Sequence, residues 1–329
     1  MRTSFRVAVV GVSHWHAPRY LGPLAQQGER IVAVWDADPA VAAKVAGETG
    51  ARTGQGLGEL LRETKPDVIF GMGIHAQMPA LLATMLETPA ALVLEKPLGI
   101  HATDVAPLVE RAEREGRFAA VAFTQRISPL WQKADELAAA GRLGRPCYAH
   151  FRVINGAPER YIRDGVGWML DPAQSGGGSL INLGTHTLDA FNRFVGGEEV
   201  AVVSAQLGYL AHGAAVEDYS VALLRSASGV LASVESGYCY PTMAPGGDQE
   251  WRLVTSNAYI IQRSDALLVR TLDDGKLERL PACSSADPYE LFVADTLCRL
   301  RTGMPPAATL RDGLKVLQLV EAIYQAAGR

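Results

Sequence analysis

The sequence is poor in cysteine, and this limits the metal and disulfide chemistry it can carry. Its four cysteines lie far apart, without the spacing of a metal site or of a disulfide framework: Cys147, Cys239, Cys283 and Cys298. We expect reduced thiols and no metal site. His14 and His16 are close in sequence, but no acidic or cysteine ligand accompanies them, so we favour a place near a cofactor or substrate over a metal pair.

Long apolar runs and basic clusters are also missing. No uninterrupted apolar stretch approaches the roughly 20 residues that a membrane-spanning helix needs, and the first residues lead into a strand without a signal-peptide pattern. The net charge is −4, and no basic cluster is interleaved with aromatic residues. These absences argue against membrane and nucleic-acid partners, and we expect a cytoplasmic protein.

What the sequence does have is length and apolar content. A chain of 329 residues with 48% hydrophobic residues exceeds what one core usually serves, so we expect two domains. Over residues 1–123, short apolar runs alternate with helical patterns, which predicts an α/β Rossmann-type dinucleotide-binding domain with a parallel sheet. Over residues 124–329, strands follow one another without helical crossovers, which predicts an α+β domain with a large, mainly antiparallel sheet.

The segment from Phe5 to Asp36 has the pattern of a nucleotide-binding βαβ unit. Two apolar runs are joined by a turn at Gly11 and a helix-like stretch, and the second run ends at Asp36. Gly11 permits a sharp turn under a pyrophosphate, the helix start offers N–H groups, and Asp36 can accept hydrogen bonds from a ribose diol. Because Ser13 and His16 replace the usual second and third glycines, an ordinary βαβ crossover is the alternative.

Lys96 is the most reactive-looking residue of the first domain. It lies just beyond the apolar strand at residues 91–94, and ligands of open α/β sheets gather at the carboxyl ends of the strands. A lysine there can act as an acid or base if burial and a nearby positive charge lower its pKa. The alternative is a surface lysine paired with Glu95.

Residues 176–189 form a second candidate site. They begin with three glycines, which permit close backbone approach to a ligand or cofactor. A helix from Ser179 onward would place four polar residues on one side: Asn182, His186, Asp189 and Arg193. The alternative is a solvated helix face that carries an incidental histidine.

Together these motifs resemble the Gfo/Idh/MocA family, named after glucose-fructose oxidoreductase, inositol dehydrogenase and a rhizopine-catabolism protein. The resemblance covers nearly the whole chain and rests on motifs in this order: residues 9–11, residues 34–39, Glu95-Lys96-Pro97, Arg126, residues 141–144 and residues 176–189. It implies a nicotinamide-dependent oxidoreductase that acts on a sugar, cyclitol or related polyol. Lys96 matches the lysine of the family's Glu-Lys-Pro motif, and His186 matches the histidine of its Asp-x-x-x-His motif.

The expected site residues follow from these matches. As cofactor-binding residues we expect Gly11, Ser13, His14, Trp15, Asp36, Met72, Gly73, Glu95 and Lys96. As catalytic residues we expect Lys96, His186 and Asn182, and as substrate-binding residues Arg126, Trp168, Asn182 and His186. For Arg126 the alternative is a surface salt bridge, and for Trp168 it is a core or interface aromatic residue.

Two departures from the family pattern bear on mechanism. Asn182 stands where the family has an aspartate, and an asparagine can orient a hydroxyl but carries no charge that would raise the proton affinity of Lys96 or His186. The segment at residues 71–77 also differs from the family's usual Thr-Pro and later histidine, with Gln77 in the place of that histidine. The cofactor loop after the third strand is therefore expected to differ.

The preferred mechanism is reversible hydride transfer between a secondary alcohol carbon and the nicotinamide. We expect His186 to be the direct acid or base, because its ordinary pKa is near neutrality, and Lys96 to polarise or protonate the same oxygen. The Asp36 carboxylate would repel a ribose 2′-phosphate, so NAD is preferred over NADP. Arg19 could still approach a phosphate from the first helix.

Two rival functions stay open at this point. The first is a redox-assisted lyase or glycosidase that uses NAD catalytically. The second is a dinucleotide- and sugar-binding sensor with little chemistry, which only Asn182 supports. A broad sheet with one uncovered face also predicts a homodimer or homotetramer.

Two further elements are predicted near the end of the chain. Residues 309–327 have the pattern of an amphipathic helix with Thr309 as its N-cap, and the family resemblance suggests that this helix packs near the first domain. Residues 239–250 are rich in proline and glycine and predict a loop.

Overall fold

The protein is described from a computed structural model, which covers residues 4–241, 247–281 and 288–329. The described chain divides into two compact units. The first unit comprises residues 1–124 and 288–314, and the second comprises residues 125–287 and 315–329. The expected boundary between residues 123 and 124 lies one residue from this division, but residues 288–314 lie with the first unit.

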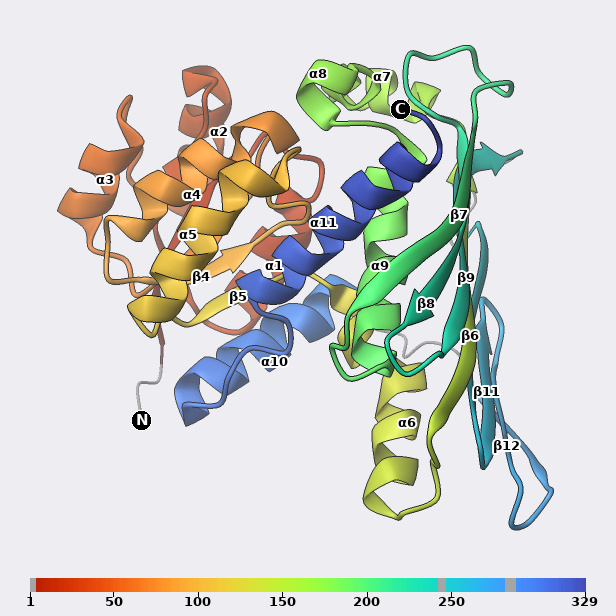
Figure 1. The fold of residues 1–329 in the computed structure, drawn as a ribbon. Helices are drawn as coiled ribbons and strands as arrows, with labels where there is room; N and C mark the ends of the chain where they lie inside the picture. Colours follow the sequence, from red (N-terminus) through yellow and green to blue (C-terminus); the bar gives the residue numbers. More distant parts are fainter. Residues whose placement is uncertain (1–3, 242–246, 282–287) are drawn as a thin grey trace. The chain divides into compact units, whose positions relative to one another are not determined.

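The first unit is built on a parallel sheet with the strand order β2-β1-β3-β4-β5. Its strands are β1 (Arg6–Val10), β2 (Arg30–Trp35), β3 (Val68–Gly71), β4 (Ala91–Leu94) and β5 (Ala119–Val121). Its helices are α1 (Ala17–Gln26), α2 (Pro39–Thr49), α3 (Leu57–Thr64), η1 (His75–Gln77), α4 (Met78–Leu86), α5 (Ala102–Arg114) and α10 (Pro288–Thr302). This confirms the predicted Rossmann-type architecture (Figure 1).

The burial of these strands explains why they could be recognised as continuous apolar runs. All four residues of β3 are buried, and so are the last four of β1. Strands that are covered by helices on both faces carry no polar alternation. Because the strands are parallel, their carboxyl ends lie at one edge of the sheet. The residues that directly follow β1, β2, β3 and β4 at this edge are Gly11, Asp36, Met72 and Glu95.

The second unit is built on an eight-stranded sheet with the order β13-β12-β11-β10-β6-β9-β8-β7. Its strands are β6 (Pro146–Gly156), β7 (Val200–Gly208), β8 (Tyr219–Ser226), β9 (Leu231–Tyr240), β10 (Asp248–Thr255), β11 (Ala258–Arg263), β12 (Leu267–Thr271) and β13 (Leu277–Leu280). All paired strands are antiparallel except β6 and β9, so the expectation of a mainly antiparallel sheet is confirmed.

The second unit also contains helical segments, some of which pack on this sheet. They are η2 (Thr124–Ile127), α6 (Pro129–Ala139), α7 (Glu159–Arg163), η3 (Gly167–Leu170), α8 (Pro172–Ser175), the π-helical turn η4 (Leu180–Gly184) and α9 (Thr185–Phe194). Figure 1 shows α6 and α9 beside the sheet. Along β8 the buried and less buried residues alternate strictly, which is the pattern of a strand with one face packed and the other open.

The last helix, α11 (Leu310–Ala326), begins as the sequence predicts. The Asp312 backbone N–H donates to the Thr309 hydroxyl at 3.2 Å, and the Thr309 N–H donates to the Asp312 carboxylate at 2.7 Å. This reciprocal pair satisfies two donors at the helix start. The predicted apolar side is buried along the whole helix: Leu310, Leu314, Leu317, Val320, Ile323 and Tyr324.

Two details of the second sheet differ from the prediction. The expected loop at residues 239–250 is wrong at both ends, because β9 extends to Tyr240 and β10 begins at Asp248, while residues 242–246 lie outside the described residues. The strand β13 is not predicted from the sequence. Three of its four residues are exposed, so it has no apolar alternation, and only its pairing with β12 defines it.

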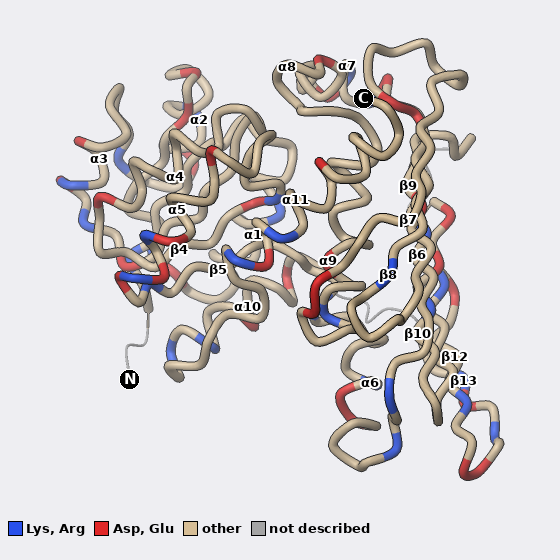
Figure 2. Tube along the Cα trace, in the orientation of Figure 1, with Lys and Arg blue, Asp and Glu red and all other residues tan. Residues whose placement is uncertain are grey.

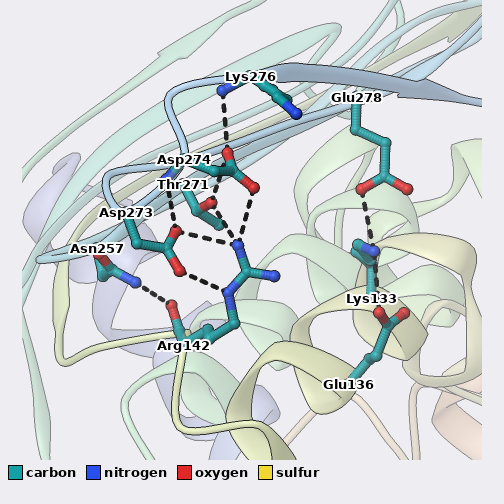
Figure 3. Close-up of polar contacts among 9 residues, drawn as sticks. All are labelled: Lys133, Glu136, Arg142, Asn257, Thr271, Asp273, Asp274, Lys276 and Glu278. Atoms are coloured by element: carbon teal, nitrogen blue, oxygen red, sulfur yellow. Dashed lines mark hydrogen bonds and ion pairs between the residues drawn. The ribbon is translucent and has the colours of Figure 1, made fainter.

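The Gly-Arg-Leu-Gly turn after α6 holds the β12–β13 hairpin (Figure 3). The Arg142 guanidinium lies 2.7 Å from Asp273 and 3.0 Å from Asp274, and it donates to the Thr271 hydroxyl at 3.0 Å. Its backbone carbonyl accepts a hydrogen bond from the Asn257 side chain at 2.5 Å. Because these groups are largely exposed, we assign the motif a role in fixing the hairpin.

Candidate functional site

Gly11 makes the turn after β1 because a side chain there would collide with the backbone. Its φ is +81°, and a Cβ atom would lie 1.8 Å from the Met72 carbonyl oxygen. The Gly11 N–H donates to the Trp35 carbonyl at 2.7 Å, and the Met72 N–H donates to the Val10 carbonyl at 3.0 Å. The glycine therefore lets the ends of three neighbouring strands meet.

Asp36 shapes the loop that follows β1. Its side chain is 6% exposed, and its two carboxylate oxygens accept hydrogen bonds from the Ser13 N–H at 2.7 Å and the Asp38 N–H at 2.9 Å. A carboxylate oxygen can accept more than one hydrogen bond, so both oxygens keep capacity for a ribose diol. This residue and Gly11 provide the turn and the acceptor that a dinucleotide requires at this edge.

Aromatic residues fill the loop where glycines are usual. His14 stacks on Trp15 with ring centroids 4.4 Å apart, and the His16 N–H donates to His14 Nδ1 at 3.2 Å. Burial lowers the pKa of His14 well below its ordinary value, and the neighbouring His16 adds to this effect. A neutral His14 agrees with the accepting role of its Nδ1. The side chains of His14, Trp15 and His16 therefore pack against one another in this loop.

The segment after β3 is tightly packed. Met72 is 1% exposed and His75 is 2% exposed. A Cβ atom at Gly73 would lie 2.8 Å from a methyl group of Leu81, so this position accepts a larger residue only if that flexible side chain moves. Met72 and Gly73 therefore contribute backbone, rather than a mobile side chain, to the edge where a cofactor is expected.

Lys96 is buried at the end of β4, with 5% of its surface exposed. Burial lowers its pKa from the ordinary 10.5 to about 8, while the adjacent Glu95 carboxylate acts in the opposite direction. Glu95 is 3% exposed; burial favours its protonated form, but His16, His14 and Lys96 together hold its pKa below the ordinary value. The alternative of a surface lysine is therefore wrong, because Lys96 is buried.

In the second unit, Asn182 is held by two tyrosines. Its Nδ2 donates to the Tyr161 hydroxyl at 2.6 Å and to the Tyr238 hydroxyl at 3.0 Å, and all three residues are buried. The Arg160 guanidinium donates to the same Tyr161 oxygen at 2.7 Å. Burial raises the pKa of Tyr238 well above its ordinary value, so this hydroxyl keeps its proton. Sequence reasoning missed both tyrosines and Arg160.

Asn182 lies in the π-helical turn η4, and His186 lies in the first turn of α9. A π turn inside an α-helix is rare and often marks a functional site. His186 is partly buried, and nearly every other residue of α9 is buried, including Asp189 at 1% exposure. The interpretation of this segment as a solvated helix face is therefore wrong. The expected partners belong to different units, with Lys96 in the first and Asn182 and His186 in the second.

The buried carboxylate of Glu217 anchors the start of this helical segment. It accepts hydrogen bonds from the Gly178 N–H at 2.8 Å, from the Leu180 N–H at 3.0 Å and from the Tyr324 hydroxyl at 2.9 Å. Burial raises the Glu217 pKa, and these backbone hydrogen bonds oppose the rise. A Cβ atom at Gly178 would lie 2.2 Å from the Glu217 carbonyl oxygen. The group that approaches the backbone of these glycines closely is thus Glu217 of the same chain.

Arg126 is engaged in a buried ion pair within the second unit. Its guanidinium contacts both carboxylate oxygens of Asp189, at 2.6 Å and 2.9 Å, and the two side chains are 10% and 2% exposed. The salt bridge weighed as an alternative exists, but it is buried rather than at the surface. Trp168 lies in η3 and is partly exposed, so it is not a core aromatic residue.

Two features are absent from the described part of the chain. No helix there is long and apolar enough to cross a membrane. No group of three or more histidine, cysteine or acidic side chains there is arranged to hold a metal ion. Of the four cysteines, Cys147, Cys239 and Cys298 are unbridged and exposed, and Cys283 lies outside the described residues.

Comparison with known proteins agrees with this architecture. Residues 5–123 match the oxidoreductase family with an NAD-binding Rossmann fold, and residues 131–261 match the Gfo/Idh/MocA C-terminal domain. These matches define the class of the protein, an enzyme of the NAD(P)-dependent dehydrogenase type. The chain belongs to the Gfo/Idh/MocA family.

Individual relatives are similar to the chain at low identity, over the whole chain or over part of it. D-xylose 1-dehydrogenase (NADP(+)) 2 of Haloferax volcanii is 26% identical, over 93% of this chain and 92% of its own. Inositol 2-dehydrogenase 3 of Saccharopolyspora erythraea is 32% identical over 37% of each chain. The structure of an aldose-aldose oxidoreductase from Caulobacter crescentus, 20% identical, covers 100% of this chain and 99% of that chain with a TM-score of 0.82, which shows a shared fold.

Proposed function

We propose that the protein is an NAD-dependent dehydrogenase that oxidises a secondary alcohol of a sugar, cyclitol or related polyol, in a reversible reaction. The observation that carries the proposal is the burial of Lys96 at the carboxyl end of β4, with its pKa lowered to about 8. A lysine of this kind can exchange a proton near neutral pH, which an exposed lysine does poorly. The xylose and inositol dehydrogenases among its relatives support a polyol substrate.

The residues present fit a dinucleotide. Gly11 would admit the pyrophosphate, Asp36 would accept from the adenosine ribose, and the backbone of Met72 and Gly73 would line the same edge. When bound, the nicotinamide supplies the acceptor or donor of the hydride. We favour NAD, because the Asp36 carboxylate would repel a 2′-phosphate; the xylose dehydrogenase relative is named as NADP-dependent, so this preference rests on Asp36 alone.

In this mechanism we assign the proton transfer to Lys96, whereas the sequence alone favours His186 as the direct acid or base. Below pH 8 Lys96 is mostly charged and would donate a proton to a carbonyl oxygen during reduction; above pH 8 it is mostly neutral and would accept the hydroxyl proton during oxidation. We propose that His186 contacts the same substrate oxygen and that Asn182, Arg126 and Trp168 orient the remaining hydroxyl groups. The roles of Lys96 and His186 then differ in pH dependence, because only Lys96 would set a limb near pH 8.

The proposal is tested by following reduced nicotinamide with NAD or NADP against aldoses, aldonates, inositols and amino sugars. We expect activity with NAD that falls about a hundredfold or more in Lys96→Ala and His186→Ala. The variant Lys44→Ala, which removes an exposed lysine of α2, is the matched control. Turnover without net change in nicotinamide would favour the redox-assisted lyase, and saturable binding of NAD and sugar without turnover would favour the sensor.

We also propose that a second copy of the chain covers the open face of the eight-stranded sheet. The registers place Glu235, Arg152, Glu250 and Arg263 side by side across four strands. Figure 2 shows acidic and basic positions along the strands of this sheet. Beside this row lie exposed apolar residues: Tyr148, Leu223, Leu231 and Tyr259. Mass measurement in solution should give a dimer or tetramer that Leu223→Lys dissociates; a wild-type monomer would contradict this assignment.

A further inference from the structure

A buried hydrogen-bonded cluster surrounds the Glu95 carboxylate within the first unit. The Tyr20 hydroxyl donates to Glu95 Oε1 at 2.7 Å, and His16 Nδ1 lies 2.9 Å from the same oxygen. The Lys96 backbone N–H donates to the other oxygen at 3.1 Å. Tyr20 is 1% exposed and Glu95 is 3% exposed, so little water can reach the carboxylate to hydrogen-bond to it in place of these donors. Each carboxylate oxygen therefore depends on donors that the protein supplies.

The contact with Glu95 is the basis on which we place the ring proton of His16. An ionised carboxylate can only accept hydrogen bonds, so the imidazole nitrogen that faces Glu95 carries hydrogen. Burial lowers the His16 pKa, and Glu95 opposes this effect, so the imidazole is neutral near neutral pH and its proton lies on Nδ1. The Tyr289 hydroxyl lies 2.7 Å from the same nitrogen, with the two rings 4.8 Å apart. With the proton on Nδ1, the Tyr289 hydroxyl can act only as a second acceptor of the N–H that faces Glu95.

His16 occupies the place of the third glycine in the usual dinucleotide-binding loop. A glycine there serves the close packing of the helix on the strand and carries no polar group. In this chain the same position carries an imidazole that joins the start of α1 to the end of β4. The contact between His16 and Glu95 therefore requires a loop with histidine, rather than glycine, at this position.

Other charged and titratable groups also face this cluster. His14 receives the His16 backbone N–H, and the Arg19 guanidinium lies 5.4 Å from the Tyr289 ring centre. Lys96 and Arg19 oppose protonation of His16, and His16, His75 and Lys96 oppose protonation of His14. Glu95 is the one acidic side chain among these groups. Its charge is thus the one that favours a proton on Lys96.

We propose that His16 is a positioning residue for Lys96: its Nδ1–H holds the Glu95 carboxylate in its orientation, and the charge of that carboxylate governs how readily Lys96 gives up its proton. The inference rests on the proposed function, in which Lys96 is the acid or base of a dehydrogenase.

The sign of the effect follows from the burial of both partners. Burial alone favours neutral Glu95 and neutral Lys96, and each charge is held by the other and by the donors around Glu95. Without the His16 donor the Glu95 carboxylate stays charged, because its pKa lies well below its ordinary value, but it is no longer held in place. The attraction that holds the proton on Lys96 then weakens, so Lys96 should lose its proton at lower pH.

The test measures the titration of Lys96 directly. The chain has six lysines, so selective ¹³C labelling at the lysine Cε gives a small set of NMR signals, and Lys96→Arg assigns the signal of interest. We expect a midpoint near 8 in the wild type, a fall of roughly half a unit to one unit in His16→Phe, and the largest fall in Glu95→Gln. His16→Asn should restore most of the difference, because its amide N–H can replace Nδ1–H.

The control is His101→Phe, which removes an exposed imidazole before α5 and should leave the titration unchanged. If His16→Phe does not fold, His16→Gln replaces it, because its longer side chain presents its amide where Nε2 lies. An unchanged Lys96 midpoint in the His16 variants, beside a lowered one in Glu95→Gln, would overturn the proposal, as would a Glu95→Gln midpoint equal to that of the wild type. A wild type without dehydrogenase activity but with the expected titrations would refute the proposed function and leave this positioning role standing.

Discussion

The burial of Lys96 should cost the protein stability, and this cost is measurable. The pKa of Lys96 falls from its ordinary 10.5 in the unfolded chain to about 8 in the folded protein. A difference of about 2.5 pKa units at 1.36 kcal/mol per unit amounts to roughly 3 kcal/mol. At pH 7 both states carry the proton, so the folded state bears the full cost of the buried charge. The variant Lys96→Met should therefore be more stable than the wild type.

The dependence on pH gives the sign of this effect independently. Between pH 8 and 10.5 the unfolded chain holds the lysine proton while the folded protein has released it, so unfolding takes up a proton. Wild-type stability relative to Lys96→Met therefore rises with pH across this window. The advantage of the variant should fall from roughly 3 kcal/mol at pH 7 to less than about 1 kcal/mol at pH 10.

Urea unfolding should be followed by hydrogen exchange of peptides from β1, β3 and β4, because a protein of two units need not unfold in one step. Lys44→Met, which alters an exposed lysine, is the control and should show no such gap at either pH. A Lys96→Met protein that is less stable than the wild type at pH 7, or a gap that does not change with pH, would refute the reasoning.

Three further perturbations test the sites described above. Glu217→Gln should lower the free energy of unfolding by about 2–4 kcal/mol, since the amide turns a donor toward one of two buried N–H groups. Tyr324→Phe removes only one hydrogen bond to Glu217 and should cost about 1 kcal/mol. Equal melting temperatures for the two variants would contradict the role of Glu217 as an anchor. Gly11→Ala should lower the free energy of unfolding by at least about 3 kcal/mol. Gly28→Ala should lower it by less, because Gly28 has a φ of +72° but nothing lies within 4 Å of its Cβ position. Similar melting temperatures for the two variants would exclude the clash with Met72. Asn182→Asp should shift the pH profile of kcat/KM by placing a charge in the turn that precedes His186, and an unchanged profile would put Asn182 outside the proton-transfer site.

The first sheet could be predicted from the sequence because its strands are buried on both faces. Continuous apolar runs such as residues 68–70 have few other interpretations, and the turn residues Gly11 and Asp36 follow them directly. The second sheet was predicted less completely. The strand β13 has the sequence Leu-Glu-Arg-Leu and is mostly exposed, so no local pattern distinguishes it from a loop. Its existence depends on the register with β12, which is a property of the folded chain.

The helix that carries His186 shows the limit of local patterns. Helical spacing predicted a shared face for Asn182, His186 and Asp189, but it could not predict the burial of Asn182 and Asp189. The groups that enclose this segment come from distant parts of the sequence, including Tyr161, Glu217 and Tyr238. The π-helical turn has no signature in composition. Only the glycines at residues 176–178 indicated that something approaches closely, and they did not indicate what.

Asn182 gains a physical meaning that the sequence alone could not provide. Compared with the family's aspartate, it is a lost charge; in the structure it is a donor whose two N–H groups are taken by Tyr161 and Tyr238. An aspartate at this position offers only oxygens, so both hydroxyls would have to turn and donate, although the Tyr161 oxygen also receives the Arg160 guanidinium. The asparagine and the two tyrosines are therefore one arrangement, and the single substitution is best understood through its partners. This is why Asn182→Asp should affect both the pH profile and the packing of the tyrosines.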